Sequence, residues 1–316
     1  MPVLRSTRAR RAGRLLVLLA CVAGAAILWQ RHAHVSAQAD SDTLHVSVAG
    51  RDVAVWKPAG PAPSRGYPLI LFSHGYTGCN TQSAFLMRAL AQAGYLVLAP
   101  NHKDATCGSA RDTWYPGKML AERPQEPFRD AQQWSDATYR DRREDIEGVL
   151  DAVLHEHPFQ GVPIDSSRVG ISGHSLGGYT ALGLAGAWPS WKDHRIKAVL
   201  ALSPHCSPFL LKGDLGNMDI PVMYQGGTAD LGETPVVQRD GGVYDQSSKP
   251  KYFVELDGAG HFAWTNLNKR YQDVIDAYSV AFFDHYLKGQ TVPDPLARMM
   301  EDPLPAGVSA VRSTTH

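Results

Sequence analysis

The segment 168-RVGISGHSLGGY-179 contains the pattern from which the organisation of the whole chain can be worked out. Apolar residues typical of a strand lead into Gly173-His174-Ser175-Leu176-Gly177, and small residues typical of a helix follow. This order predicts a sharp G-x-S-x-G turn, with an unfavourable φ at Ser175 and no room for side chains at Gly173 and Gly177. Such a turn would expose the Ser175 hydroxyl above the carboxyl edge of a sheet. We therefore expect Ser175 to be a nucleophile; the alternative is a glycine-rich turn whose serine has no catalytic role.

The composition limits the kinds of protein that the chain can be. Its 316 residues are 44% hydrophobic, which is enough for one large α/β domain. Lys and Arg together number 31 and so do Asp and Glu, so the charge balance gives no support for nucleic acid as a partner. The sequence has no C-x-x-C pair and no histidine cluster with metal-ligand spacing. We therefore expect neither a structural metal nor a cofactor.

The N-terminus has the features of an export signal. Five arginines in the first 14 residues precede an apolar run from Leu15 to Trp29, which at 15 residues is short. A membrane-spanning helix needs roughly 20 apolar residues, whereas a charged stretch before a shorter apolar run is typical of a secretory signal. Residues 1–39 are predicted to be a signal peptide, with A-x-A sites at residues 37–39 and 23–25, or an uncleaved membrane anchor. Either would place the folded part in the periplasm or outside the cell; an ordinary first helix is the alternative.

Three cysteines lie beyond that segment: Cys79, Cys107 and Cys206. In an oxidising compartment two of them could form a disulfide. The preferred pair is Cys79 with Cys107, because both fall in loops that follow successive predicted strands. Three unpaired thiols are the alternative.

The remaining pattern predicts the fold class. Two alternating segments flank Gly50 as in a β-hairpin, and continuous apolar runs further on are typical of parallel strands covered on both faces. The predicted strands are residues 44–48, 52–56, 69–72, 95–99, 198–202, 222–225 and 252–256. Helices are predicted at residues 82–93, 136–155 and 271–287. This order indicates an α/β fold with a mostly parallel central sheet, helices on both faces and no large cap domain.

Three parts of the chain fall outside this regular alternation. Residues 101–135 are polar and aromatic, and because long irregular segments of compact domains are often functional, we expect part of a substrate wall there; a surface excursion is the alternative. The charges from Arg140 to Glu147 are interpreted as the solvated face of a helix. Residues 291–316 are predicted to be a flexible tail, which leaves residues 40–290 for the folded domain.

A serine hydroxyl becomes a good nucleophile only when a neutral imidazole accepts its proton and a carboxylate orients that imidazole. Asp230 directly follows one predicted strand after Ser175, and His261 directly follows another, within the glycine-rich Asp257-Gly-Ala-Gly-His261 loop. We predict both as catalytic partners, with Glu233 as the reserve acid. His205 follows a third strand and is expected to line the pocket or simply to lie in a loop.

Two backbone amides are expected to bind the oxyanion that forms when a carbonyl is attacked. The first is the amide of Leu176, at the start of the helix that follows Ser175. The second is the amide of Tyr76, in the loop after the strand at residues 69–72, where Gly75 has no side chain to hold the backbone away from the edge of the sheet. The ring of Tyr76 is then expected to line the site for the acyl group.

These motifs resemble a known superfamily. Phe72-Ser73-His74-Gly75, the Ser175 turn, the Asp230 loop and the His261 loop resemble the α/β-hydrolases, over residues 69–287. Within them the resemblance is strongest to platelet-activating-factor acetylhydrolases, dienelactone-hydrolase-like proteins and bacterial cutinases. It implies Ser175, His261 and Asp230 as the triad, with Tyr76 and Leu176 as the oxyanion donors.

The resemblance implies a serine carboxylesterase acting on small-molecule or lipid esters, and the N-terminal segment predicts that it is exported. Its alternatives are a lipase or cutinase-like polyester hydrolase, a phospholipid acyl esterase, and a hydrolase-like binding protein without activity. Three departures matter. Ser175 stands where true dienelactone hydrolase has a cysteine, His205 lies in the loop where cutinases carry a tryptophan, and those cutinases lack a segment like residues 101–135.

Overall fold

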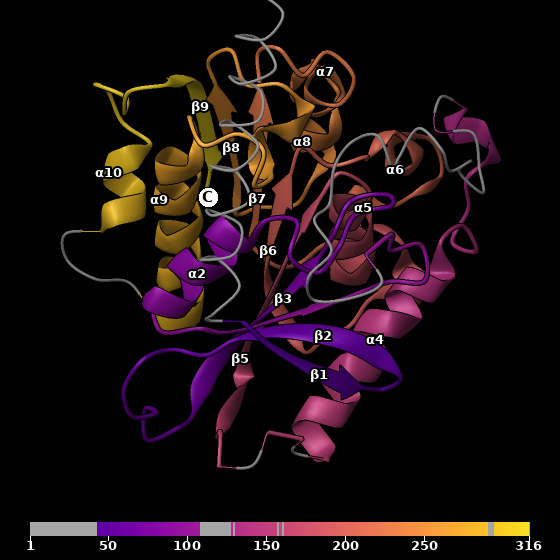
Figure 1. Ribbon diagram of the computed structural model, residues 1–316. Coiled ribbons are helices and arrows are strands. Elements are labelled where there is room, and N and C mark those ends of the chain that lie inside the picture. The colour runs from indigo at the N-terminus through magenta and orange to yellow at the C-terminus, as the bar shows by residue number, and fades with distance from the viewer. Residues whose placement is uncertain are drawn as a thin grey trace, which may run out of the picture. The chain divides into compact units, whose positions relative to one another are not determined.

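A computed structural model describes residues 43–107, 128, 130–156, 158–159, 161–289 and 294–315. Within these ranges nine strands form one sheet in the order β1-β2-β4-β3-β5-β6-β7-β8-β9 (Figure 1). The strands are β1 Leu44–Val48, β2 Arg51–Trp56, β3 Tyr67–Ser73, β4 Leu96–Pro100, β5 Ile164–His174, β6 Ile196–Leu202, β7 Val222–Gly227, β8 Lys251–Leu256 and β9 Val308–Thr314.

The centre of the sheet is parallel, as predicted. Strands β3 to β8 run parallel to one another, whereas β2 is antiparallel to β4 and β9 is antiparallel to β8. The predicted hairpin is β1 and β2, in which Leu44 pairs with Val55 and Val48 pairs with Arg51. All the carboxyl ends of the parallel strands therefore lie at one edge, where the loops that carry the predicted site residues begin.

Helices cover both faces of this sheet (Figure 1). Successive residues of a strand point to opposite faces, so in β3 Leu69 and Leu71 belong to one hydrophobic cluster, and Ile70 and Phe72 to another. The first cluster includes residues of α4 and α5, and the second includes residues of α2 and α9. Burial on both faces explains why the parallel strands are continuously apolar.

The helices predicted at residues 82–93, 136–155 and 271–287 and the one after Ser175 correspond to α2, α4, α9 and α5, with shifts at their ends, whereas α6, α7, α8 and α10 were not predicted. The helices are α2 Ala84–Gln92, α4 Arg140–His155, α5 Leu176–Leu182, α6 Ser207–Lys212, α7 Thr234–Gln238, α8 Val243–Gln246, α9 Gln272–Phe283 and α10 Pro295–Met299. Short 3₁₀ and π turns lie between them: η1 Ala131–Gln133, η2 Gly183–Ala187, η3 Pro189–Trp191, η4 Leu215–Asn217, η5 His261–Trp264 and η6 Asp284–Lys288.

The prediction of a flexible tail at residues 291–316 is wrong. After α10 the chain returns to the sheet as β9, which pairs with the whole of β8 from Lys251 to Leu256. Ser309 adds a side-chain hydrogen bond from its Oγ to Glu255 Oε2, 2.9 Å away. Proline-rich residues before α10 suggested a loose end, but the alternation in Val308–Thr314 suits an edge strand with one covered face.

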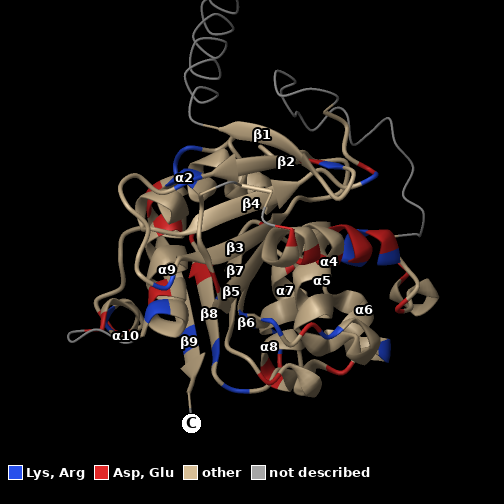
Figure 2. Cartoon of the chain, turned by 90° about the horizontal axis from the view of Figure 1, so that it is seen from below, with Lys and Arg blue, Asp and Glu red and all other residues tan. Residues whose placement is uncertain are grey.

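The interpretation of α4 as a helix with a solvated charged face is wrong for two residues. Acidic and basic residues lie side by side along this helix, in keeping with a largely solvated surface (Figure 2). Arg142 and Asp145, however, are only 1% and 6% exposed. Asp145 lies three residues after Arg142, and the buried Ile146 lies four residues after Arg142, so the two charged side chains share the inward face of the helix.

The structure pairs Cys79 with Cys107, whose Cα atoms are 5.7 Å apart, and leaves Cys206 as a buried free thiol. The predicted signal or anchor at residues 1–39 lies outside the described residues. Within the described ranges, no helix has both the length and the apolar composition that crossing a bilayer requires.

Candidate active site

The turn at Ser175 has the strained geometry that its sequence predicts. Strand β5 ends at His174 and α5 begins at Leu176, so Ser175 alone makes the turn, with φ of 56°. A Cβ at Gly173 would lie 2.1 Å from the Gly177 carbonyl oxygen, and a Cβ at Gly177 would lie 1.9 Å from the Ser73 carbonyl oxygen. Both glycines are therefore required where the strand, the helix and β3 meet.

The structure brings the three predicted triad residues together at the carboxyl edge of the sheet. His261 Nε2 lies 2.9 Å from Ser175 Oγ, and Nδ1 of the same ring lies 3.3 Å from Asp230 Oδ2. Asp230 is in the loop after β7 and is 4% exposed, whereas the side chain of His261, in the loop after β8, is 26% exposed. A partly exposed serine and imidazole backed by a buried carboxylate is an arrangement that can transfer a proton from a nucleophile to a leaving group.

A fourth side chain, Ser203, lies within this set and is not among the sequence predictions. Its Oγ is 2.8 Å from His261 Nδ1 and donates a short hydrogen bond to Asp230 Oδ2. Ser203 directly follows β6, at the same edge as the other loops, and has φ of 42°. Its position directly after a strand was the signal available in the sequence, but a single serine at such a position is not enough to predict a site residue.

The electrostatics keep Asp230 ionised. Burial opposes its charge, but hydrogen bonds from His261 and Ser203 and the proximity of the imidazole outweigh burial and lower the pKa of Asp230 below its usual value. The carboxylate can therefore hold the Nδ1 proton of His261 in place, which leaves Nε2 free of a proton and facing Ser175 Oγ.

Glu233, the reserve acid, is paired with a different histidine. Its Oε1 lies 2.9 Å from His205 Nδ1, and His205 is 4% exposed. The backbone N–H of His205 donates to the Ser175 carbonyl oxygen, 3.0 Å away, so this second pair lies directly beside the nucleophile turn. The structure therefore brings Asp230, and not Glu233, to His261.

Part of the irregular segment at residues 101–135 packs beside the site. Phe128 and Trp134 contact the His205 ring, with centroids 5.0 and 4.7 Å away, and Phe128 lies edge-on to Tyr76 at 5.3 Å. Residues 108–127 lie outside the described ranges. The described end of the segment thus forms an aromatic cluster with Tyr76, and whether it contacts a substrate stays a prediction.

The predicted oxyanion donors lie on two adjacent segments of the chain, the start of α5 and the loop after β3. Leu176 directly follows Ser175 as the first residue of α5, and Tyr76 lies in the loop after β3. The close approach of Gly177 to the Ser73 and His74 carbonyl groups shows that these segments touch.

His174, between the glycine and the serine of the turn, connects three loops. Its Nε2 donates to the His261 carbonyl oxygen at 2.8 Å, and its Nδ1 accepts from Gln82 Nε2 at 2.8 Å. Gln82 Oε1 in turn accepts from the Gly75 N–H at 3.2 Å. Burial, with the nearby His261 ring, lowers the pKa of His174 to about 3, so the ring stays neutral and makes both hydrogen bonds.

A second Ser-His-Asp set is buried in the interior of the fold. Ser73 Oγ is 2.8 Å from His102 Nε2, and His102 Nδ1 is 3.0 Å from Asp145 Oδ2. These side chains are at most 6% exposed, and Arg51 Nε donates to the other oxygen of Asp145 at 2.6 Å. A buried serine cannot reach a substrate, so this set serves to satisfy polar groups in the interior.

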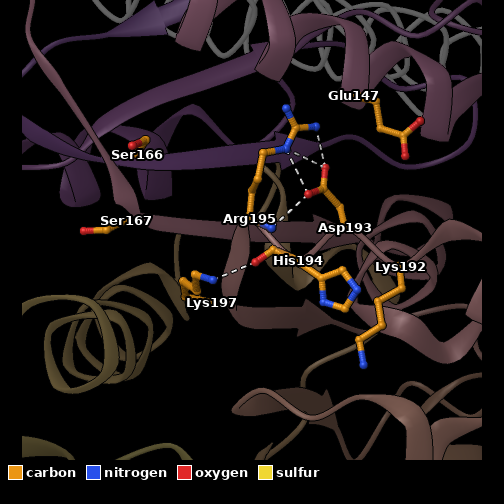
Figure 3. A pocket seen from close by; sticks show the side chains of 8 residues that line it. All are labelled: Glu147, Ser166, Ser167, Lys192, Asp193, His194, Arg195 and Lys197. Atoms are coloured by element: carbon orange, nitrogen blue, oxygen red, sulfur yellow. Dashed lines mark hydrogen bonds and ion pairs between the residues drawn. The ribbon is translucent and has the colours of Figure 1, made fainter.

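One cavity in the described ranges lies away from the triad. It measures about 640 Å³ and lies at the amino ends of β5 and β6, at the opposite edge of the sheet. Within it Arg195 points at Asp193, and Lys197 Nζ donates to the His194 carbonyl oxygen (Figure 3).

Comparison with known proteins identifies the family. The profile of the PET hydrolase-like family matches residues 140–312, which is more than half of the chain, and that of platelet-activating factor acetylhydrolase, isoform II, matches residues 41–154. Cutinase 2 of Thermobifida cellulosilytica is 26% identical over 234 residues, which cover 73% of this chain and 72% of the cutinase.

Two further relatives show the same two likenesses. Cutinase cut1 of Thermobifida fusca is 26% identical over 73% of this chain and 60% of its own length. Platelet-activating factor acetylhydrolase of Cavia porcellus is 26% identical over 45% of this chain and 36% of its own length. With its mostly parallel sheet and its serine turn, the chain has the α/β-hydrolase fold and belongs to the PET hydrolase-like family.

Proposed function

We propose that the protein is an exported serine carboxylesterase that hydrolyses carboxylic esters through an acyl-enzyme intermediate. Its family and its relatives are ester-hydrolysing serine hydrolases. The observation that carries the proposal is the continuous set of contacts from Ser175 Oγ to His261 and on to Asp230. Export is supported by the arginine-rich and apolar order of residues 1–29.

In the proposed reaction His261 Nε2 accepts the proton of Ser175 as Oγ attacks the ester carbonyl carbon. Asp230 stabilises the imidazolium, which then donates its proton to the leaving alcohol. A water molecule repeats the sequence on the acyl-enzyme, releases the acid and restores Ser175. The balance is one water consumed for one ester bond broken, and it needs no cofactor.

The negative oxygen of each tetrahedral intermediate is bound by the amides of Tyr76 and Leu176. Each preorganised donor of this kind contributes about 3 kcal/mol to transition-state stabilisation. The position of Leu176 at the start of α5 and the contact of the Tyr76 loop with Gly177 support this assignment.

A polyester is the second candidate substrate. The PET hydrolase-like profile and the cutinase relatives favour it, whereas the acetylhydrolase relative favours a phospholipid with a short acyl chain. His205, whose ring contacts Phe128 and Trp134, lies in the loop where cutinases carry a tryptophan, so the wall beside Ser175 differs from theirs.

The test is hydrolysis of p-nitrophenyl acetate, butyrate and octanoate by the purified full-length protein, beside its Ser175→Ala variant. We expect the variant to lose activity by a factor on the order of 10⁶. Falling activity from acetate to octanoate would support a short-acyl esterase, and the reverse order a lipase or polyester hydrolase. Equal activity of the variant, or failure of Ser175 to react with a fluorophosphonate, would reject the mechanism.

A further inference from the structure

The peptide unit between Gly75 and Tyr76 is held firmly from its carbonyl side. The Gly75 oxygen accepts three hydrogen bonds: from His74 Nδ1 at 2.7 Å, from Arg142 Nη2 at 3.0 Å and from the Gly78 N–H at 3.0 Å. His74 Nε2 accepts from the His102 N–H, so the proton of this ring is on Nδ1 and points at Gly75.

Arg142 is the residue that connects these contacts to the rest of the fold. Its guanidinium is buried, and besides Gly75 it donates from Nη1 to the His74 carbonyl oxygen at 2.7 Å. Its Nε and Nη2 bind the two oxygens of Asp104 at 3.1 and 2.7 Å. Asp104 Oδ2 also accepts from the Thr77 N–H at 3.0 Å. One side chain of α4 thus binds two consecutive carbonyl groups of the loop, and its carboxylate partner binds the next part of the same loop.

The direction of the Tyr76 amide follows from this arrangement. In a trans peptide the C=O and the following N–H point in opposite directions, so fixing the Gly75 carbonyl towards Arg142 turns the Tyr76 N–H away from Arg142. The same loop touches the nucleophile turn, because a Cβ at Gly177 would lie 2.7 Å from the His74 carbonyl oxygen. The buried cation also polarises the peptide, which strengthens its N–H as a donor.

We propose that Arg142 is a positioning residue for the oxyanion hole, which orients the Tyr76 amide through the carbonyl oxygens of His74 and Gly75. The inference rests on the proposed function and adds a determinant of its rate. A guanidinium suits this task because its planar fork binds two carbonyls and a carboxylate together, and a lysine ammonium cannot reproduce that geometry.

The test compares Arg142→Lys with Arg168→Lys in the full-length protein. Arg168 is a matched control because it also binds a carboxylate and a backbone carbonyl, Asp165 at 2.7 Å and Gly66 at 3.1 Å, but lies near the start of β5, away from the triad. Activity towards p-nitrophenyl acetate is measured per reactive serine titrated with a fluorophosphonate. Inhibition by phenylboronic acid, whose serine adduct carries a negative oxygen, reports on the oxyanion hole directly.

For Arg142→Lys we expect kcat and kcat/KM to fall together by about tenfold to a hundredfold, with KM unchanged. The inhibition constant for phenylboronic acid should rise by a similar factor, and the midpoint of the pH–rate profile should stay in place because the triad is untouched. Arg168→Lys should match the wild type in all of these measurements.

Unchanged boronate inhibition in Arg142→Lys would overturn the inference while the proposed function stands. If that variant does not fold, Asp104→Asn is the second test, because it keeps Arg142 but weakens the carboxylate contact that holds the guanidinium. We expect a smaller loss of kcat and of boronate inhibition in Asp104→Asn. No loss in that variant overturns the inference. If Ser175→Ala is as active as the wild type, the proposed function fails and the inference fails with it.

Discussion

Ser203 Oγ lies closer to His261 Nδ1 than the triad carboxylate does, at 2.8 Å against 3.3 Å for Asp230 Oδ2. The hydroxyl donates to Asp230 and can accept from the imidazole, so it bridges the two along the path that orients the ring. Ser203 holds this position in a left-handed backbone conformation with 1% exposure. The orientation of His261 therefore depends on two oxygens.

Replacing Ser203 with Ala should lower kcat without abolishing activity. The variant removes one hydrogen bond of His261 and one of Asp230, but the direct contact between them remains. We expect a loss of about tenfold, against about 10⁴-fold for Asp230→Ala. Steady-state kinetics on p-nitrophenyl acetate decide the point, and a loss in Ser203→Ala as large as that in Asp230→Ala would show that the carboxylate alone does not orient His261.

The substitution Glu233→Gln should leave the hydrolytic mechanism intact. Glu233 pairs with His205, whereas the carboxylate partner of His261 is Asp230. The amide oxygen of Gln can still accept from His205 Nδ1. We therefore expect kcat close to that of the wild type, with any change confined to the ranking of acyl lengths. A loss comparable to that of Asp230→Asn would assign Glu233 to the triad instead.

The parts of the site that could be predicted from sequence are those in which local pattern and chemistry coincide. Ser175 lies in a motif that requires its glycines, because a Cβ at Gly177 would lie 1.9 Å from a carbonyl oxygen, and Asp230 and His261 each follow an apolar strand. The parallel centre of the sheet was predictable because burial on both faces leaves continuous apolar runs.

The features that could not be predicted from the sequence depend on contacts between residues far apart in the chain. Arg142 lies in a helix rich in charge, and its burial follows only from the approach of Asp104 and the loop at Gly75. Ser203 becomes part of the site only because the loops after β7 and β8 bring Asp230 and His261 next to it. Strand β9 needs the edge of β8, so its short alternating sequence close to the C-terminus was not enough to indicate a strand.

The stability of the protein should fall in mild acid because buried histidines are kept neutral by the fold. Burial, followed by the charge of Arg142, lowers the pKa of His74 to about 4, and burial lowers that of His174 to about 3. In the unfolded chain both bind a proton near pH 6.5, so between about pH 6.5 and 4 the unfolded state binds more protons. The contribution of these two histidines to the free energy of unfolding is complete above about pH 6.5 and is lost as the pH falls towards 4.

Urea unfolding at pH 7, 6 and 5 measures this loss. The free energy of unfolding should decrease at each step, and the decrease should be smaller in His174→Gln, which has one proton-binding group fewer. His194→Gln is the control, because this side chain is exposed and makes no such buried contacts. A free energy of unfolding that stays constant from pH 7 to pH 5 would contradict neutral burial of His74 and His174.

Removing the disulfide should cost stability more than activity. The bond from Cys79 to Cys107 closes a loop with a sequence separation of 28, and the double replacement by Ala should lower the free energy of unfolding by about 3 kcal/mol. The loop keeps other ties to the neighbouring segment, such as the hydrogen bond from Thr106 Oγ1 to the Thr77 carbonyl oxygen at 2.8 Å, and Arg142 still binds Gly75. We therefore expect kcat at 25 °C to stay near the wild-type value.

Cys206→Ala, which removes a buried thiol outside the bond, controls for lost packing. If a reducing agent does not change the stability of the wild type, and the double variant is no less stable than Cys206→Ala, the bond does not stabilise the fold. A large fall in kcat in the double variant would mean that the disulfide, in addition to Arg142, sets the geometry of the oxyanion loop.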